Sequence, residues 1–177
     1  MEDFMGEDKI KNVPACQQKG ELAPFAGALL PSRDTISDLL CRELIAAAQK
    51  MMARAYAPYS GFQVGAALLA SGKKVFTGCN IENAAFTPGI CAERTAFAKA
   101  VSEGEREFTA IAVIGGKNGI PVDYTAPCGV CRQVMAEFCD PQKFYIILAR
   151  SQDDYWLYRL DELFPMAFSP KNLSVGL

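Results

Sequence analysis

The spacing of apolar residues predicts that regular structure begins near residue 35 with an amphipathic helix. Asp34 or Thr35 can cap this helix, and Pro58 lies beyond its end. Apolar residues recur at intervals of three and four, which places them on one helix face. The stripe consists of Ile36, Leu39, Leu40, Leu44, Ala47, Ala48 and Met51. We therefore expect that face to pack against the rest of the domain.

Downstream, the pattern alternates between strands and helices. Strands are predicted over 62–69, 74–79, 108–114, 144–148 and 155–158, with Ser71-Gly72 as the turn of the first hairpin. Helices are predicted over 91–103 and 128–139, and a short one over 161–164. The strands at 108–114 and 144–148 are almost wholly apolar, which is typical of burial on both faces. This order of elements predicts an α/β domain layered around a mixed sheet.

Residues 1–34 differ from the rest because they show no sustained hydrophobic period. They mix acidic residues, Lys, Gln, Gly and Pro. We expect a mobile N-terminal extension over 1–34, followed by one domain over 35–177. The apolar part at 22–30 can pack loosely on the domain or contact a partner.

The overall charge is small and limits the class of partner. The formal net charge is −2, without the basic stripe that binding a nucleic-acid polymer requires. A small nucleoside remains compatible, because it carries no phosphate. The stretch 22–30 is too short to span a membrane, and the acidic N-terminus is unlike a signal peptide. Seven cysteines, an odd number, argue against a secreted disulfide scaffold. We therefore expect a soluble, cytoplasmic protein with no membrane partner.

The chain contains no histidine, and this restricts its chemistry. Catalysis by Ser-His-Asp or Cys-His is excluded, as are imidazole metal ligands. Acid–base chemistry has to come from carboxylates, Lys, Tyr or Cys. A transition-metal site has to be built from sulfur and oxygen ligands.

Three cysteines are candidate zinc ligands because each is predicted at a helix start. Cys128 and Cys131 form a C-x-x-C behind Pro127, and Cys91 opens another helix. The positive end of a helix favours thiolate, and zinc takes thiolates at about 2.3 Å. Three protein ligands leave a fourth position for water, as in a catalytic site. A closed structural site with a fourth cysteine and a redox C-x-x-C are alternatives. Cys41, Cys79 and Cys139 are interpreted as small buried apolar residues.

Two charged residues follow Cys91 directly. Glu93 can point beside a metal-bound water and exchange protons with it, or it can be a solvated residue of the first helical turn. Arg94 can donate to the sulfurs and offset the formal charge of about −1 that three thiolates give a zinc site. A surface ion pair is the alternative for Arg94.

Several motifs in order resemble the cytidine deaminase family. They are Cys91-Ala92-Glu93-Arg94, Pro127-Cys128-Gly129-Val130-Cys131-Arg132-Gln133, the segment 56–68, the segment 78–84 and the C-terminal Glu162-Leu163-Phe164-Pro165 with Phe168. The resemblance covers roughly residues 35 to 170. It implies a three-layer α/β/α sandwich around a five-stranded mixed sheet, with one Zn²⁺ per subunit. It also implies hydrolytic deamination of cytidine and 2′-deoxycytidine in pyrimidine salvage, with Glu93 as the proton shuttle.

The resemblance also implies roles for substrate-binding residues. Asn80 and Glu82 would bind the ribose hydroxyls, Phe62 would stack on the pyrimidine, and Tyr59 would line the pocket. The backbone beside Cys91, at Ala92, and beside Cys128 would orient the base. In the homotetramer typical of the family, Phe86 and Phe168 would reach the active site of a neighbouring subunit. For Phe62, Phe86 and Phe168 the alternative is ordinary core packing, and for Asn80 and Glu82 it is turn or surface polarity.

The sequence departs from the family pattern at three places. Position 86 is Phe where relatives often carry Tyr. The segment between the Cys91 and Cys128 motifs, which includes 115–119, is slightly long, and we expect a surface loop there to absorb the extra length. The extension has no counterpart. Three other functions remain open: a deaminase of another aminopyrimidine compound, a nucleotide or polynucleotide deaminase, and a structural zinc-binding module. A polynucleotide enzyme would need basic residues near the pocket, and it normally uses a histidine ligand.

Overall fold

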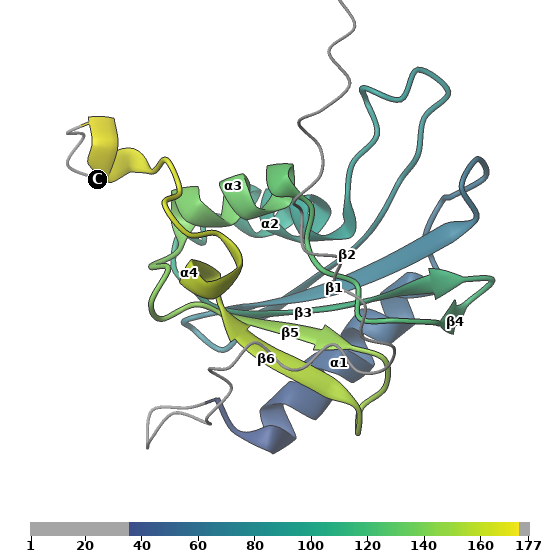
Figure 1. The fold of residues 1–177 in the computed structure, drawn as a ribbon, viewed down its shortest axis with the longest axis horizontal. Helices are drawn as coiled ribbons and strands as arrows, with labels where there is room; N and C mark the ends of the chain where they lie inside the picture. The colour runs from purple at the N-terminus through teal and green to yellow at the C-terminus, as the bar shows by residue number, and fades with distance from the viewer. Residues whose placement is uncertain (1–35, 174–177) are drawn as a thin grey trace, which may run out of the picture.

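The computed structural model describes residues 36–173, which build one sheet with helices on both faces (Figure 1). The helices are α1 (Asp38–Met52), α2 (Ala92–Ser102), α3 (Gly129–Phe138), α4 (Leu160–Leu163) and the 3₁₀ helix η1 (Pro170–Leu173). The strands are β1 (Phe62–Ala70), β2 (Val75–Cys79), β3 (Phe108–Lys117), β4 (Ile120–Pro121), β5 (Tyr145–Ala149) and β6 (Tyr155–Arg159). The predicted extension, residues 1–34, lies outside the described residues, as does Thr35.

The sheet is mixed, as the sequence predicts. Its strand order is β2-β1-β3-β5-β6, and the short β4 pairs with β3 beside this path. The pair β3 and β5 is parallel, whereas the other pairs are antiparallel. The expected five strands therefore form the main path, and β4 is an addition.

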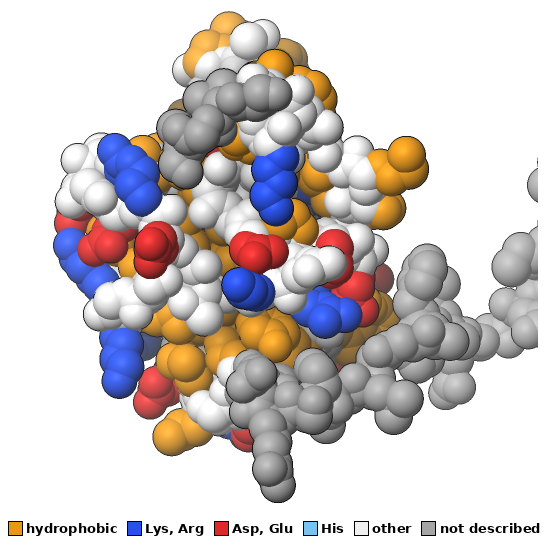
Figure 2. Space-filling model, turned by 90° about the vertical axis from the view of Figure 1, so that its left-hand side faces the viewer, with side chains coloured by type: hydrophobic (Ala, Val, Ile, Leu, Met, Phe, Trp, Pro, Cys, Tyr) orange, Lys and Arg blue, Asp and Glu red, His pale blue; other side chains and the backbone are white. Residues whose placement is uncertain are grey.

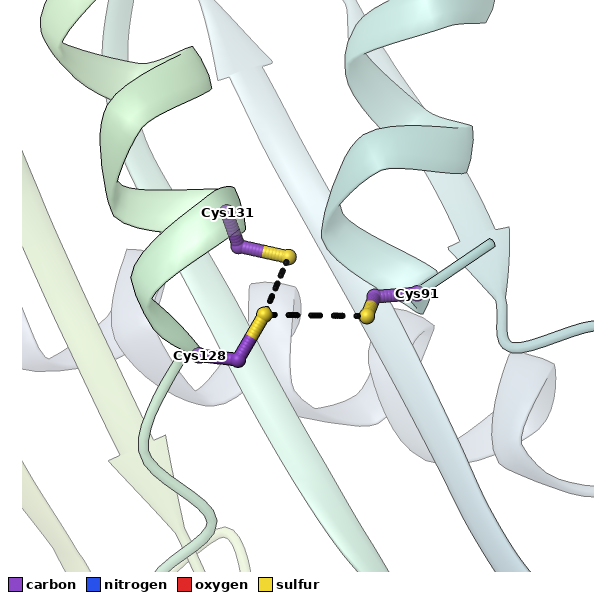
Figure 3. Close-up of side chains that lie close together, drawn as sticks. All are labelled: Cys91, Cys128 and Cys131. Atoms are coloured by element: carbon purple, nitrogen blue, oxygen red, sulfur yellow. Dashed lines mark hydrogen bonds between the residues drawn. The ribbon is translucent and has the colours of Figure 1, made fainter. Parts of the chain in front are cut away.

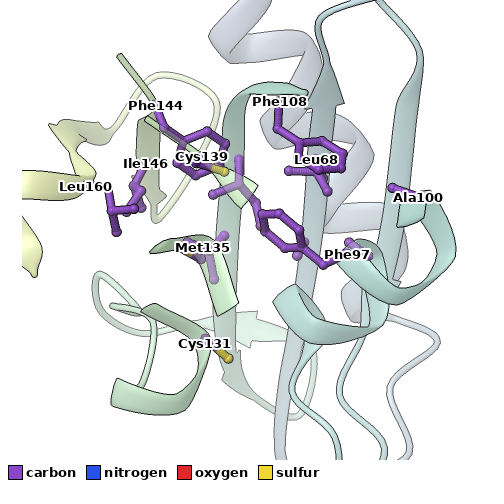
Figure 4. Close-up of a cluster of buried hydrophobic side chains, with 14 of the residues drawn as sticks. Leu68, Phe97, Ala100, Phe108, Cys131, Met135, Cys139, Phe144, Ile146 and Leu160 are labelled. Atoms are coloured by element: carbon purple, nitrogen blue, oxygen red, sulfur yellow. The ribbon is translucent and has the colours of Figure 1, made fainter. Parts of the chain in front are cut away.

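Side chains of the central strands alternate between two buried clusters, one on each face of the sheet. One cluster lies between the sheet and α1. The other lies between the sheet and the pair α2 and α3, and Phe97 and Phe108 pack edge to face within it at 5.0 Å (Figure 4). Both faces of β3 and β5 are buried, because each strand contributes residues to both clusters. The three-layer prediction is thus confirmed.

The helix α1 starts later than predicted. Its N-cap is Ser37, whose hydroxyl accepts a hydrogen bond from the Leu40 amide at 3.3 Å. Its buried residues are Cys41, Leu44, Ile45, Ala48 and Met52. The predicted stripe was wrong at Leu39, which is 68% exposed, because the buried face lies slightly further round the helix. A period of three to four tolerates such a rotation, and only the packing on the sheet decides it.

The predicted surface loop at 115–119 is instead part of a hairpin. Strand β3 continues to Lys117, and Asn118 and Gly119, both with positive φ, form the turn into β4. The prediction of a loop at Gly116 was wrong, because this glycine is needed where β4 packs closely against β3. A Cβ atom there would lie 1.9 Å from the Ile120 carbonyl oxygen, so β4 can approach only a glycine.

The start of α2 rests directly on the sheet at Gly78. A Cβ atom at Gly78 would lie 2.3 Å from the Ala92 carbonyl oxygen and 2.6 Å from the Ala96 amide nitrogen. The missing side chain therefore lets the first turn of α2 touch β2. This contact fixes the height of Cys91 and Glu93 above the sheet.

The described surface carries charges of both signs. On the face seen in Figure 2, Lys and Arg side chains lie beside Asp and Glu side chains, with hydrophobic side chains below them. Within residues 36–173, no helix is both long enough and apolar enough to cross a membrane.

Candidate active site

Three cysteine sulfurs meet where the N-termini of α2 and α3 lie side by side (Figure 3). Cys91 is the N-cap of α2, Cys128 is the N-cap of α3, and Cys131 lies in the first turn of α3. The Sγ atoms of Cys91 and Cys128 are 3.8 Å apart, and those of Cys128 and Cys131 are 3.5 Å apart. All three sulfurs lie within 4.8 Å of one another.

These distances fit a tetrahedral zinc site. A Zn–S bond of about 2.3 Å places neighbouring sulfurs about 3.8 Å apart. Within the described residues, this is the only group of three or more Cys, Asp or Glu side chains close enough to share a metal ion. Cys79 and Cys139 are buried elsewhere and do not complete the set, as expected. Three protein ligands leave one position open for water or substrate.

The sulfur atoms also perturb one another electrostatically. The neighbouring Cys131 thiol lowers the pKa of Cys91 to about 5; burial opposes this shift, whereas Arg94 and Cys128 reinforce it. The same contact with Cys91, together with burial, raises the pKa of Cys131. A cation held by the sulfurs would relieve this competition for protons, because zinc binds the thiolate form of each.

Glu93 is the only charged residue that is buried among the residues described, with 5% of its surface exposed. Burial raises the pKa of its carboxyl, and the Cys91 sulfur raises it further. Hydrogen bonds from its own backbone amide and from Cys131 act in the opposite direction, as does Arg94. The carboxyl therefore faces the sulfur cluster rather than solvent, so the interpretation as a solvated first-turn residue is excluded.

Arg94 also interacts with the sulfur cluster. One of its terminal nitrogens donates to the Gly89 carbonyl oxygen at 3.1 Å, while its buried Nε has no partner. Burial acts to lower the pKa of Arg94, but the Cys91 and Cys131 sulfurs raise it above its ordinary value. A surface ion pair is thus not its environment, and its charge faces the sulfurs.

A depression of about 500 Å³ opens beside Cys91. Its wall contains four of the predicted substrate-binding residues, Tyr59, Asn80, Glu82 and Phe86, and the predicted ligand Cys91. The rings of Tyr59 and Phe86 lie 6.3 Å apart at its rim. The structure therefore brings together the segment before β1 and the connection between β2 and α2.

Asn80 and Glu82 are held rigidly by the segment that precedes β1 and by β1 itself. The Asn80 amide donates to the Phe62 carbonyl at 2.8 Å and accepts from the Val64 amide at 2.7 Å. The Glu82 carboxylate accepts hydrogen bonds from the Tyr59 amide at 2.9 Å and from Ser60. These hydrogen bonds, from Ser60 first, lower the pKa of Glu82. Both side chains are therefore fixed in direction but keep hydrogen-bonding capacity toward the depression.

The remaining predicted residues lie outside this depression. Phe62 is half-buried at the start of β1, and its backbone carbonyl accepts a hydrogen bond from the Asn80 side chain. Ala92 is fully buried, and as the first residue of α2 it carries one of the backbone amides that a helix leaves unpaired. Phe168 is 57% exposed and Phe86 is 79% exposed, so core packing is excluded for both. Within the described chain, Phe168 is not brought to the metal cluster.

Two residues with positional roles were missed in the sequence. Ser60 ties the segment before β1 to Glu82, and its place in the 56–68 motif was an available signal. Arg132 donates from Nε to the Pro127 carbonyl at 2.7 Å and from its guanidinium to the Leu163 carbonyl, so it links the Cys128 segment to α4. Its neighbour Gln133 holds the Phe168 carbonyl at 2.8 Å. Local sequence patterns do not predict such long-range contacts with the backbone.

The α/β sandwich, the three converging thiolates and the buried carboxylate together define a zinc-binding enzyme with an open ligand position. Comparison with known proteins agrees. The family model for the cytidine and deoxycytidylate deaminase zinc-binding region matches residues 41–148. The chain therefore belongs to the cytidine deaminase family, which comprises zinc-binding hydrolases.

Individual relatives match over most of their length. A cytidine deaminase from Sporosarcina psychrophila is 48% identical over 132 residues, which is 75% of this chain and 93% of that protein. One from Halalkalibacterium halodurans is 48% identical over 121 residues, or 68% and 87% of the two chains. The crystal structure of cytidine deaminase from Burkholderia pseudomallei has a TM-score of 0.65 at 46% identity, covering 71% of this chain and 97% of that one. The structure from Mycobacterium tuberculosis has a TM-score of 0.61 at 36% identity, covering 71% and 94%.

Metal content should depend on the sulfur cluster specifically. We expect about one zinc per purified chain, and we expect Cys128→Ser to lose most of it, because a hydroxyl is a far weaker zinc ligand than a thiolate. Cys79→Ser is the matched control, since Cys79 lies outside the cluster and its thiol donates to the Arg54 carbonyl, as a hydroxyl can. Elemental analysis of the three proteins checks this. Equal zinc in all of them would contradict the assignment of the ligands.

Proposed function

We propose that this protein catalyses the hydrolytic deamination of cytidine and 2′-deoxycytidine to the corresponding uridines, with release of ammonia. The observation that carries the proposal is the buried Glu93 carboxyl beside the cluster of three cysteines, one of which, Cys91, lines the same depression as Asn80 and Glu82. Water and the nucleoside are consumed, and the 4-amino group leaves as ammonia, so no redox cofactor is needed.

Cys91, Cys128 and Cys131 would hold the zinc ion. When bound, zinc lowers the pKa of a water toward neutrality and so supplies hydroxide at physiological pH. Glu93 would take a proton from the attacking water as its oxygen bonds to C4, deliver that proton to N3 of the base, and then help to protonate the amine as its bond to C4 breaks and it leaves as ammonia. Burial suits this role, because a site that excludes water prevents the proton carried by the carboxyl from being lost to solvent.

The walls of the depression would recognise the nucleoside. Asn80 and Glu82 are preorganised by hydrogen bonds to the chain segment around β1, so they can bind ribose hydroxyls without losing further side-chain freedom. The Phe62 ring would stack on the pyrimidine, and the amide of Ala92 would orient it. Tyr59 lines the entrance.

A free nucleoside is favoured over a nucleotide or a polymer. The residues that line the depression include a carboxylate, Glu82, and no Lys or Arg, so a phosphate has no partner there. The reaction suits pyrimidine salvage. We also propose a cytoplasmic location, supported by the free thiols of all six cysteines in the described part of the chain.

We also propose a homotetramer in which neighbouring subunits complete each site. Phe86 and Met166 support this, because both have positive φ and are 79% and 102% exposed. Exposing large apolar side chains on a strained backbone is unfavourable unless a partner covers them. Phe168, 57% exposed, lies in the same C-terminal segment as Met166.

Replacing Glu93 tests the reaction directly. Glu93→Gln should bind zinc normally but deaminate cytidine about 10²–10⁴-fold more slowly, because an amide cannot exchange the proton. Ultraviolet assays with cytidine, cytosine and dCMP measure turnover and specificity, and Glu107→Gln, which alters an exposed carboxylate, is the control. Near-native turnover by a zinc-loaded Glu93→Gln protein would refute the mechanism.

Replacing Arg94 tests whether its charge offsets that of the thiolates. Arg94→Ala should lower zinc affinity or turnover about 10–100-fold, the range seen for groups that support metal ligands. Competition with a chelator gives the affinity, and Arg54→Ala removes an exposed arginine as the control. Unchanged zinc affinity together with unchanged turnover would exclude this role.

The oligomeric state follows from the mass in solution. Light scattering should give four chains of 19.2 kDa, about 77 kDa in total. A monomer with full cytidine turnover would show that each site is complete without its neighbours.

A further inference from the structure

Three residues from distant parts of the sequence meet on the metal-binding side of the sheet. Phe62 starts β1, Gly115 lies near the end of β3, and Thr125 belongs to the segment that leads from β4 to Cys128. In the register of β1 and β3, Gly115 pairs with Val64, so Phe62 is its diagonal neighbour on the same face. Val64 and Val113 pack in the cluster beneath α2 and α3, which identifies this face as the one that carries the cysteines.

Gly115 provides space rather than an unusual backbone conformation. A Cβ atom there would lie 2.8 Å from Thr125 Oγ1, 3.1 Å from Thr125 Cγ2 and 3.1 Å from Phe62 Cε1. A glycine inside a strand often marks such a close approach. The absent side chain thus leaves a notch in β3 that the Phe62 ring and the Thr125 side chain share.

The chain segments on both sides of this notch are anchored close to it. The Phe62 amide donates to the Ser60 hydroxyl at 2.9 Å, and its carbonyl accepts from Asn80. On the other side, the Tyr124 ring stacks on Trp156 at 4.0 Å, and its hydroxyl donates to Asp154. Crowding in the notch can therefore be relieved mainly by moving the Phe62 ring or the Thr125 side chain.

We propose that Gly115 and Thr125 are positioning residues that set the Phe62 ring at the height needed to stack on the pyrimidine. This inference rests on the proposed function, because it assigns the purpose of the notch to substrate binding. Neither residue touches the reacting atoms. Their effect on the reaction passes through Phe62, so it should appear in substrate binding before it appears in the chemical step.

The test compares Gly115→Ala with the wild type and with Gly72→Ala, a matched control in which the added Cβ meets no atom within 4 Å. Gly115→Ala should raise KM for cytidine about tenfold through overpacking, with a smaller change in kcat and unchanged zinc content. Gly72→Ala should match the wild type. A Gly115→Ala protein with a lowered melting temperature but native KM would show a merely structural role and overturn the proposal.

A double-mutant cycle shows whether the effect passes through the ring. In a Phe62→Leu background, Gly115→Ala should cost much less than in the wild type, and Thr125→Ala should partly rescue Gly115→Ala. Additive penalties, or loss of zinc in step with activity, would overturn the proposal.

The Thr125→Ala variant provides an independent test of the notch. If Gly115→Ala does not fold, Thr125→Ala alone should raise KM about threefold because the ring gains freedom. An unchanged KM for that variant overturns the proposal. A folded wild type that fails to deaminate cytidine would instead refute the proposed function itself.

Discussion

The site depends on one arrangement: two helix N-termini lie side by side over the same face of the sheet and present three thiolates to one point. Each helix end contributes partial positive charge and unpaired amides, which favour thiolate over thiol. The first turn of α2 reaches its position because Gly78 lets it touch β2. The apolar cluster around Phe97 and Met135 then holds α2 and α3 against the sheet (Figure 4). Hydrophobic packing thereby sets the sulfur positions that the metal requires.

The start of α2 also places two charged residues, Glu93 and Arg94, beside the sulfurs. Glu93 follows Cys91 by two residues, so the same turn of helix that presents a ligand buries a carboxyl next to it. Arg94 is the next residue, and its guanidinium spans from the sulfurs to the Gly89 carbonyl. Gly89 lines the depression, so Arg94 connects the cluster to its wall. One short stretch of sequence thus supplies a cysteine of the sulfur cluster, the buried carboxyl that we propose moves the proton, and the charge that we propose offsets the thiolates.

The sequence predicted the local features well and the long-range ones poorly. Cys91, Cys128 and Cys131 were identifiable because a C-x-x-C and a third cysteine each coincide with a helix start, and the absence of histidine narrowed the ligand set. The alternation of strands and helices was also predicted correctly, because strands buried on both faces form nearly continuous apolar runs in the sequence. The predicted buried face of α1 was wrong at Leu39, which is exposed, and the predicted loop at 115–119 was wrong, because β3 continues into a hairpin there. The buried face of α1 and the hairpin at 115–119 both depend on which chain segment packs against them, and the spacing of apolar residues does not contain that information.

The glycines illustrate this limit in physical terms. In the sequence, Gly115 and Gly116 resemble a flexible connection, but in the structure each allows a close approach by another segment. Likewise, the sequence predicts Asn80 and Glu82 as ribose-binding residues, with turn or surface polarity as the alternative, but it does not predict that they also tie the neighbouring segments of the pocket together. The direction of both side chains beside the depression is therefore a property of the fold. Residues of this kind become recognisable only when the packing partners are known.

The most direct test of the account is to remove zinc with a chelator and titrate it back while following the conversion of cytidine to uridine. The account predicts no turnover without metal and a linear recovery that ends at one zinc per chain. Full turnover by the metal-free protein, or zinc binding at the three cysteines with no deamination of cytidine, would contradict it.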